Sequence, residues 1–340
     1  MTYEEVMENA KTLGLSCRVC GECNGKACRG EVPGVGAKGS GKSFINCVEY
    51  LKSIDLNLDA IYESTGEDTS FELFGRRWSM PVFGAPVGGA VFNYNSKDMD
   101  DTDLTRAQLK GALDAGTLAF TPDGPFDGLY EASMLALSDM GGAGVPTIKP
   151  WKNEEIIKKA RLAEEAGAIG LAVDVDSAGL INLKLMGKPV DPKSPADIKE
   201  IVGATKLPFF IKGVMTVRAA KICKDAGAAG IVVSSHGGRI MQDSPATCSV
   251  LPEIRAALGS DFKIIVDGGI RSGSDVFKAL ALGADAVLIG RPYTLAALAG
   301  GSEGVKLYFE KIHGELKDAM LMTGCNSLRD ITMDKIRLPK

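Results

Sequence analysis

Short apolar runs alternate with amphipathic stretches along most of the chain. Runs of four or five residues rich in Val, Ile and Ala are typical of strands in a parallel sheet that is buried on both faces. Eight such runs follow residue 80, at Pro81–Ala85, Leu118–Thr121, Val145–Ile148, Ile169–Val173, Pro208–Ile211, Gly230–Val233, Lys263–Val266 and Ala286–Ile289. Helical spacing fills most of the gaps, for example at Asn153–Ala166, Val217–Ala226, Pro252–Leu258 and Ser274–Leu282.

A helix, a glycine turn and an apolar strand recur together at four places. The turn glycines are Gly116, Gly167, Gly227 and Gly283, separated by 51, 60 and 56 residues, or about two strand–helix units each. Glycine at a helix end allows the left-handed turn that leads into the next strand. The pattern predicts an α/β fold, a closed (β/α)8 TIM barrel. An open doubly wound sheet is disfavoured because the first strand lacks the glycine fingerprint of that fold.

The first 80 residues lack the repeated strand–helix pattern of the rest of the chain and contain a Cys/Gly-rich stretch. We predict an N-terminal Cys/Gly-rich extension over residues 1–80 and a barrel domain over residues 81–340. Within the extension, the pattern indicates helices at Tyr3–Leu13 and Ser43–Leu51 and a short strand edge at Phe71–Arg77.

Composition narrows the class of protein. The chain has 340 residues, 45% of them hydrophobic, and a net charge of −4, which favours one large globular domain and excludes a basic nucleic-acid or anionic-lipid surface. No apolar run approaches the roughly 20 residues that span a bilayer, and the acidic N-terminus lacks the apolar core of a signal peptide. We therefore expect a cytoplasmic protein.

Polar residues that directly follow the predicted strands are the candidates for chemistry, because a barrel carries its active site at the carboxyl ends of its strands. His236 follows the sixth strand between a serine and two glycines, and Arg239 lies three residues further on. An arginine can hold a substrate carboxylate while the imidazole accepts a proton from the neighbouring carbon or hydroxyl. Asp174 is predicted to orient the imidazole ring, and Lys212 to stabilise negative charge on a cofactor.

The last two strands carry a candidate phosphate site. They end in VDGGIRSGSD, from Val266 to Asp275, and in LIGRP, from Leu288 to Pro292. Glycines let backbone N–H groups approach an anion, and Arg271 and Arg291 can add charge-assisted hydrogen bonds.

Three segments resemble one known family. VSSHGGRIMQDSPAT, IIVDGGIRSGSDVFKALALGADAVLIGRP and LPFFIKGVMT are similar to the FMN-dependent α-hydroxy acid oxidase/dehydrogenase family, which includes glycolate and lactate oxidases. The resemblance implies FMN at the strand carboxyl ends, His236 as catalytic base, Arg239 on the substrate carboxylate and Asp174 paired with the histidine. The cofactor contacts that we predict, most of them implied by the resemblance, are Ala85, Pro86, Val87, Thr121, Thr147, Lys212, Ser234, Asp267, Gly269, Arg271, Gly290 and Arg291.

The chain departs from the family pattern at its substrate-binding tyrosines. Thr147 and Lys149 stand where the family commonly has a Gln-Leu-Tyr segment, and the N-terminal tyrosine motif is replaced by the Cys/Gly-rich stretch. Ser235 replaces an asparagine, and the segment Asp176–Lys206 is a short lid. We predict that Lys149 takes over a tyrosine role by contacting an anionic substrate or the flavin.

These features together predict an FMN-dependent oxidoreductase that converts a small 2-hydroxy carboxylate into the 2-oxo acid. Because the family's tyrosines are missing, an alternative function is that of an FMN barrel enzyme that isomerises or reduces another anionic substrate. A non-catalytic redox or metal-responsive protein is the second alternative. The electron acceptor is left open, and the resemblance implies a homo-oligomer.

Four cysteines crowd near the N-terminus as C-x2-C-x2-C-x4-C. Cys17, Cys20, Cys23 and Cys28 are candidate metal ligands, with an iron–sulfur centre and zinc both open. The plainer interpretation is a glycine-rich loop with free thiols.

GAKGSGKS, from Gly36 to Ser43, matches the P-loop expression in full. That loop requires an apolar strand before it, and the preceding NGKACRGEVPGV has none. We therefore do not expect nucleotide hydrolysis.

Overall fold

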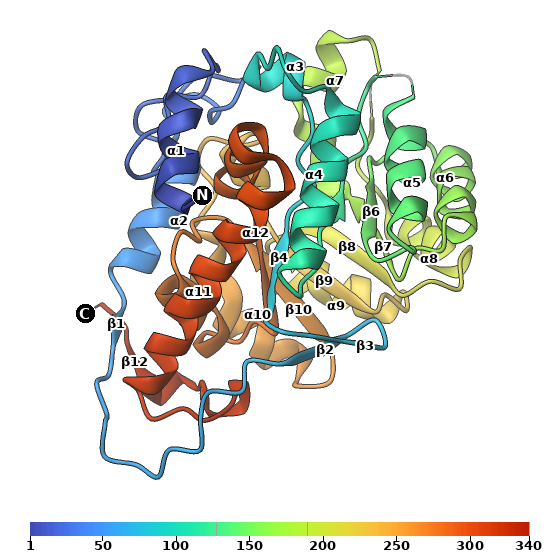
Figure 1. Ribbon diagram of the computed structural model, residues 1–340. Coiled ribbons are helices and arrows are strands. Elements are labelled where there is room, and N and C mark those ends of the chain that lie inside the picture. Colours follow the sequence, from blue (N-terminus) through green and yellow to red (C-terminus); the bar gives the residue numbers. More distant parts are fainter. Residues whose placement is uncertain (127, 189, 340) are drawn as a thin grey trace.

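The computed structural model describes residues 1–126, 128–188 and 190–339 (Figure 1). Eight parallel strands lie side by side in the order β4-β11-β10-β9-β8-β7-β6-β5, and a parallel bridge between Gly84 and Ala119 joins the first strand to the last. The predicted barrel is confirmed. Its strands are β4 Val82–Gly84, β5 Phe120–Thr121, β6 Val145–Ile148, β7 Leu171–Asp174, β8 Phe209–Val214, β9 Gly230–Val233, β10 Lys263–Asp267 and β11 Ala286–Ile289.

Helices cover the outside of the barrel and connect its strands (Figure 1). The α-helices are α1 Tyr3–Thr12, α2 Lys42–Lys52, α3 Ala90–Tyr94, α4 Asp101–Asp114, α5 Leu129–Asp139, α6 Asn153–Glu165, α7 Ile181–Leu185, α8 Pro195–Gly203, α9 Val217–Asp225, α10 Leu251–Leu258, α11 Gly273–Ala281 and α12 Arg291–Leu321. Short 3-10 turns are η1 Val175–Gly179, η2 His236–Gly238, η3 Thr247–Val250, η4 Leu328–Asp330 and η5 Met333–Lys335. The predicted helices agree with these bounds to within one or two residues.

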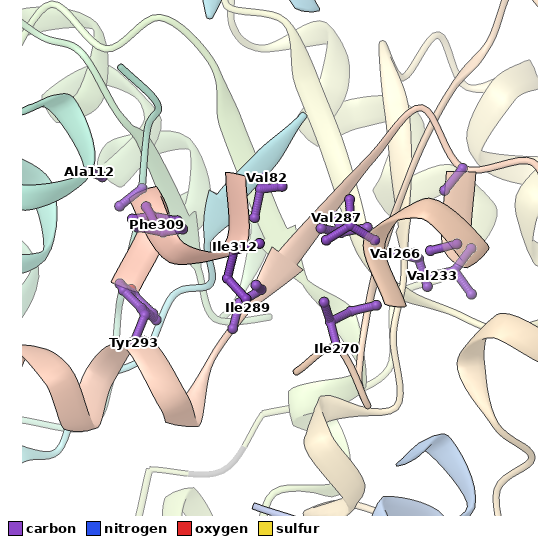
Figure 2. Packing of buried hydrophobic residues seen from close by; sticks show 14 of the residues in the cluster. Val82, Ala112, Val233, Val266, Ile270, Val287, Ile289, Tyr293, Phe309 and Ile312 are labelled. Atoms are coloured by element: carbon purple, nitrogen blue, oxygen red, sulfur yellow. The ribbon is translucent and has the colours of Figure 1, made fainter. Parts of the chain in front are cut away.

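Alternate residues of each strand face two different cores, as the strand geometry requires. Phe83, Val232 and Ile265 belong to the cluster inside the barrel. Their neighbours Val82 and Val233 belong to the cluster between the barrel and its helices, where Figure 2 shows them with residues of β10, β11 and α12. Burying an aliphatic side chain of this size stabilises the fold by about 1.5–3 kcal/mol. Because both faces of each strand are buried, the strand sequences are unbroken runs of apolar residues.

The N-terminal extension packs against the barrel and shares its core. Tyr3 of α1 packs at a tilt against Tyr308 of α12, with ring centroids 5.4 Å apart. The predicted strand edge at Phe71–Arg77 is a hairpin, β2 Phe71–Leu73 and β3 Arg76–Trp78, and Phe74 at its turn packs edge-on against Phe210 inside the barrel. The hairpin therefore covers the amino ends of the strands, opposite the predicted site.

A short two-stranded sheet joins the N-terminal extension to the C-terminal segment of the chain. Strand β1 Asp55–Leu56 pairs antiparallel with β12 Ile336–Arg337 near the C-terminus. Among the described residues, no helix combines the length and the apolar character needed to cross a membrane.

Candidate active site

A cavity of about 180 Å³ opens at the carboxyl ends of the barrel strands. Most of the predicted site residues line it, although they are spread over more than 200 positions of sequence. The lining includes Ala85, Pro86, Val87, Lys149, Asp174, Lys212, His236, Arg239, Asp267, Gly269, Arg271, Gly290 and Arg291. The strand ends meet at one mouth because all eight strands are parallel.

Thr121, Thr147 and Ser234 are fully buried at the ends of their strands and are not part of the lining. The hydroxyl of Ser234 donates to Asp267 at 2.9 Å and accepts from the Nζ of Lys212 at 2.9 Å. Among the described residues, the hydroxyls of Thr121 and Thr147 have no hydrogen-bond partner.

The backbone of His236 is held in a conformation that few residues adopt. Its φ of 53° lies in the left-handed region, and Gly237 and Gly238 follow with φ of 60° and 76°. A left-handed histidine costs of the order of 1 kcal/mol or more, so the surrounding structure must hold it there. Here the hydroxyl of Ser234 accepts a hydrogen bond from the His236 N–H at 3.1 Å.

Asp174, the last residue of β7, and Asp176 both lie beside the ring of His236, and the pairing of Asp174 with the histidine stays a prediction. The Nδ1 of His236 lies 2.9 Å from Asp176 in hydrogen-bond geometry, and 3.4 Å from Asp174. Asp174 instead accepts hydrogen bonds from Lys149 at 2.8 Å and from Lys212 at 3.3 Å. The sequence placed both aspartates after the fourth strand, but the choice between them depends on how the turn η1 bends.

Asp174 and the two lysines form a buried ion-pair network. Burial opposes ionisation of Asp174, but His236, Lys149 and Lys212 together hold its pKa well below the usual range. Burial alone would lower the pKa of Lys212, yet the carboxylates of Asp174, Asp267 and Asp176 raise it above its ordinary value. Both groups are therefore charged at neutral pH.

Lys149 points into this network. Its Nζ donates to Asp174 at 2.8 Å and to Ser177 at 2.9 Å, and its side chain is only 11% exposed. Asp123, which sequence reasoning missed, accepts from the backbone N–H of Lys149 and from the indole of Trp151. The sequence did contain a signal that could have identified Asp123 as a site residue, because it is a polar residue two positions after the end of β5.

Two partly buried arginines, Arg239 and Arg291, lie close together without an acidic partner among the described residues. Arg239 donates to the carbonyls of Gly34 and Gly36, and Arg291 to those of Val35 and Gly36. Burial and the neighbouring Arg291 lower the pKa of Arg239. Within the described part of the chain, no ion pair joins either guanidinium to a carboxylate. Two adjacent, partly buried cations that lack a carboxylate partner favour an anionic ligand.

Arg271 is also held by the N-terminal extension. Its guanidinium donates to the carbonyl of Cys23 at 2.6 Å and lies over the ring of Phe44, 5.4 Å from the centroid. The guanidinium of Arg291 also lies over the Phe44 ring, 4.3 Å from its centroid. The extension therefore forms one wall of the site. It is the same Cys/Gly-rich stretch that replaces the N-terminal tyrosine motif of the family.

The four N-terminal cysteines carry free thiols. Among the described residues, the only group of three or more candidate ligands within 4.8 Å of one another contains no cysteine. Burial raises the pKa of the Cys17 and Cys28 thiols, which disfavours the thiolates that a metal requires. The metal site predicted for Cys17, Cys20, Cys23 and Cys28 remains a prediction without support from this geometry.

The P-loop match is a loop against the mouth of the barrel. Lys38 donates its backbone N–H to Gly238, and Lys42 pairs with Asp243. In the described structure no strand precedes Gly36, although α2 follows the loop from Lys42. The described part of the chain therefore lacks the strand that a P-loop requires before its glycine-rich turn.

The residues of the cavity fit FMN. Asp267 lines the cavity, and one of its carboxylate oxygens has no hydrogen-bond partner among the described residues, so it offers a polar contact to a ring system. Arg271 and Arg291 lie beside the glycine turns that follow β10 and β11, where a phosphate would meet backbone N–H groups. The barrel fold and this set of cavity residues together indicate the class of flavin-dependent oxidoreductases.

Comparison with known proteins places the chain in a family. Residues 99–338 match the model of the FMN-dependent dehydrogenase family, so the chain belongs to it and FMN is its cofactor. It is 30% identical to 4-hydroxymandelate oxidase of Amycolatopsis orientalis, over 89% of this chain and 94% of that protein. It is 43% identical to L-lactate oxidase of Lactobacillus jensenii, but only over 48% of this chain and 40% of that protein.

Solved structures agree with this assignment. A crystal structure of mandelate oxidase with 3,3-difluoro-2-hydroxy-3-phenylpropionic acid superimposes with a TM-score of 0.79 at 27% identity, covering 100% of this chain and 99% of the other.

Proposed function

We propose that the protein oxidises a 2-hydroxy carboxylate to the 2-oxo acid, with FMN as the first electron acceptor. The observation that carries the proposal is the cavity, which is lined both by His236, whose imidazole is held by a carboxylate, and by the partly buried Arg239. These are the two groups that the reaction needs, a proton acceptor and a partner for the substrate carboxylate. The relatives named above act on lactate, hydroxymandelate and mandelate, which supports this substrate class.

His236 is the base of the proposed reaction. Its Nδ1 hydrogen is engaged by Asp176, so Nε2 is the nitrogen left to accept a proton. The substrate loses two protons and two electrons in all, as its C–O single bond becomes a carbonyl. The hydroxyl proton goes to His236 if the C–H hydrogen leaves as hydride. His236 takes the α-proton if the reaction passes through a carbanion, and both routes stay open.

Arg239 is proposed to bind the substrate carboxylate. Its present partners are backbone carbonyls of Gly34 and Gly36, which a carboxylate would replace with a stronger, charge-assisted contact. Asn93 accepts from the same guanidinium at 3.3 Å and would fix its orientation.

The cofactor would be held by the glycine turns and arginines of the last two strands. Gly269, Arg271, Gly290 and Arg291 would bind the phosphate, and the cation of Lys212 would stabilise negative charge on the ring. FMN, when bound, supplies the acceptor for two electrons.

Lys149 is proposed to contact the substrate or the flavin in place of the missing tyrosine. It lines the cavity, and its ammonium is positioned by Asp174 and Ser177. A cation at this place would favour substrates that carry a second anionic or polar group.

The test is anaerobic purification followed by addition of glycolate, lactate and mandelate to the flavin-loaded protein. We expect bleaching of the flavin absorption by at least one member of the panel. His236→Ala should keep the flavin and lose the bleaching, which separates cofactor binding from chemistry. If a broad panel of 2-hydroxy acids leaves the spectrum unchanged, isomerisation or reduction of another anionic substrate replaces this proposal.

The cytoplasmic compartment and the homo-oligomeric state stay predictions, and the sequence assigns no electron acceptor beyond FMN. Assay of the reduced protein with oxygen and with artificial acceptors would separate an oxidase from a dehydrogenase.

A further inference from the structure

The lid segment after β7 places one buried amide in the wall of the cavity. Asn182 lies in α7 and is only 6% exposed, and it lines the same cavity as His236 and Arg239. Its side-chain oxygen is buried and has no hydrogen-bond partner among the described residues. Leaving a buried acceptor unpaired is costly, so this oxygen is a place where a bound ligand would supply a hydrogen-bond donor.

The orientation of this amide follows from its contact with a second asparagine. The Nδ2 of Asn182 donates to the Oδ1 of Asn93 at 3.4 Å, which leaves the Oδ1 of Asn182 as the unpaired atom. The same oxygen of Asn93 accepts from the guanidinium of Arg239 at 3.3 Å. The Nδ2 of Asn93 donates to the carbonyl of Gly88 at 3.3 Å, which fixes the direction of its amide. The two amides therefore form a chain of hydrogen bonds that leads from Arg239 to an unpaired acceptor.

The cavity wall near Asn182 is otherwise rich in apolar side chains. Leu180 and Leu183 of the same lid segment line the cavity. Phe92 of α3 and Phe126 of the loop after β5 also line it and pack edge-on, with ring centroids 5.8 Å apart. An acceptor in such a wall discriminates between ligands, because a ligand without a donor leaves the amide oxygen unpaired and shielded from water.

The charges of the cavity determine which donor group fits. Lys149 and Arg239 both line it, so an ammonium group on a ligand would share the cavity with two cations. A second carboxylate has no hydrogen to donate to the oxygen of Asn182. A neutral hydroxyl suits both features, because it donates to an amide oxygen and accepts from a lysine or an arginine.

We propose that Asn182 selects the substrate: its side-chain oxygen accepts a hydrogen bond from a second hydroxyl, on the third or fourth carbon, while Arg239 holds the carboxylate. This inference rests on the proposed function and narrows it to 2-hydroxy carboxylates that carry a further hydroxyl. Two hydrogen bonds separate Arg239 from Asn182, so the second hydroxyl stands close to the carboxylate. Asn93 is a positioning residue for both groups.

The first experiment compares substrates that differ by one hydroxyl. The second-order rate constant of anaerobic flavin reduction is measured for glycerate against lactate, and for 2,4-dihydroxybutanoate against 2-hydroxybutanoate. In the parent, we expect the dihydroxy acid of at least one pair to react about 10- to 100-fold faster than its partner. In Asn182→Leu, which keeps a side chain of similar size but removes the acceptor, this ratio should fall to about one or below.

Three variants control the first experiment. Asn182→Ala should lose the preference as Asn182→Leu does, and it serves as the test if the leucine variant does not fold. Asn182→Asp keeps an acceptor oxygen and should retain the preference for the second hydroxyl. Lys184→Ala changes an exposed residue of the same helix α7 and should leave the ratio as in the parent.

The second experiment does not depend on oxidation. Propanoate and 3-hydroxypropanoate lack the 2-hydroxyl and cannot become 2-oxo acids, so their Kd values can be measured from the change in flavin absorption on binding. The parent should bind 3-hydroxypropanoate about tenfold or more tightly than propanoate. Asn182→Leu should bind the two acids with similar Kd values.

The outcomes separate this inference from the proposed function. Parent protein with no preference for a second hydroxyl, or Asn182→Leu with the parent's preference, would show that the inference is wrong. Equal losses with all four 2-hydroxy acids in Asn182→Leu would also overturn it, because Asn182 would then contact a group that every substrate carries. If no 2-hydroxy acid reduces the flavin, the proposed function fails, and the ratio of the two Kd values still decides whether Asn182 recognises a hydroxyl.

Discussion

Gly213→Ala is the substitution that tests most directly how the barrel positions its base. The new Cβ would lie 2.6 Å from Cβ and Cγ of Asp176, and 2.9 Å from its backbone N. Carbon atoms in contact normally stand about 3.5–4.0 Å apart, so Asp176 or β8 must shift by about 1 Å.

Two terms set the size of the effect. A φ of 97° at a residue with a side chain costs about 1–3 kcal/mol, and overpacking of a filled site costs a further 1–3 kcal/mol or so. We therefore expect Gly213→Ala to lower the free energy of unfolding by about 2–6 kcal/mol. Displacement of Asp176 should also weaken its hydrogen bond to His236 and slow flavin reduction.

The assay is urea unfolding followed by tryptophan fluorescence, together with the reduction rate of the flavin-loaded protein. Gly203→Ala is the matched control, because Gly203 lies in α8 and a Cβ there would meet nothing within 4 Å. The control should be unchanged or more stable by up to about 1 kcal/mol. Parent-like unfolding and parent-like rates in Gly213→Ala would refute the packing argument.

Three further substitutions test the charges of the site. Lys149→Met should lower the unfolding free energy by about 1–3 kcal/mol, because Asp174 keeps Lys212 as a partner, and should change the flavin spectrum or substrate KM. Lys158→Met, on the exposed face of α6, is its control, and unchanged spectrum and KM in Lys149→Met would contradict the proposed contact. Arg271→Met should raise the FMN Kd by about 10- to 150-fold in fluorescence titrations, the loss of one charge-assisted contact, and parent-like affinity would remove Arg271 from the phosphate site. Asp174→Asn should melt at lower temperature than the parent at pH 7. Because the folded-state pKa of Asp174 is lowered, its stabilisation is lost as pH falls through that value, so the two melting temperatures should converge at pH values below the ordinary aspartate pKa of about 3.9. A constant difference at all pH values would contradict this assignment.

The sequence by itself determined the barrel and most of the mouth. Each strand is a local apolar run, and each turn glycine, such as Gly227, is a local signal that needs no distant partner. Once eight parallel strands are predicted, their carboxyl ends must meet, so His236, Arg239 and Arg291 could be assigned to one site without coordinates.

Only the tertiary structure decided which groups touch. Asp174 and Asp176 are two residues apart and equally polar, and the irregular strand at Gly213 is what brings Asp176 to the imidazole. The wall that the N-terminal extension builds over Arg239 and Arg291 joins positions more than 200 residues apart. Contacts of this kind depend on how loops from different parts of the chain pack together, and no local pattern of residue types encodes that packing.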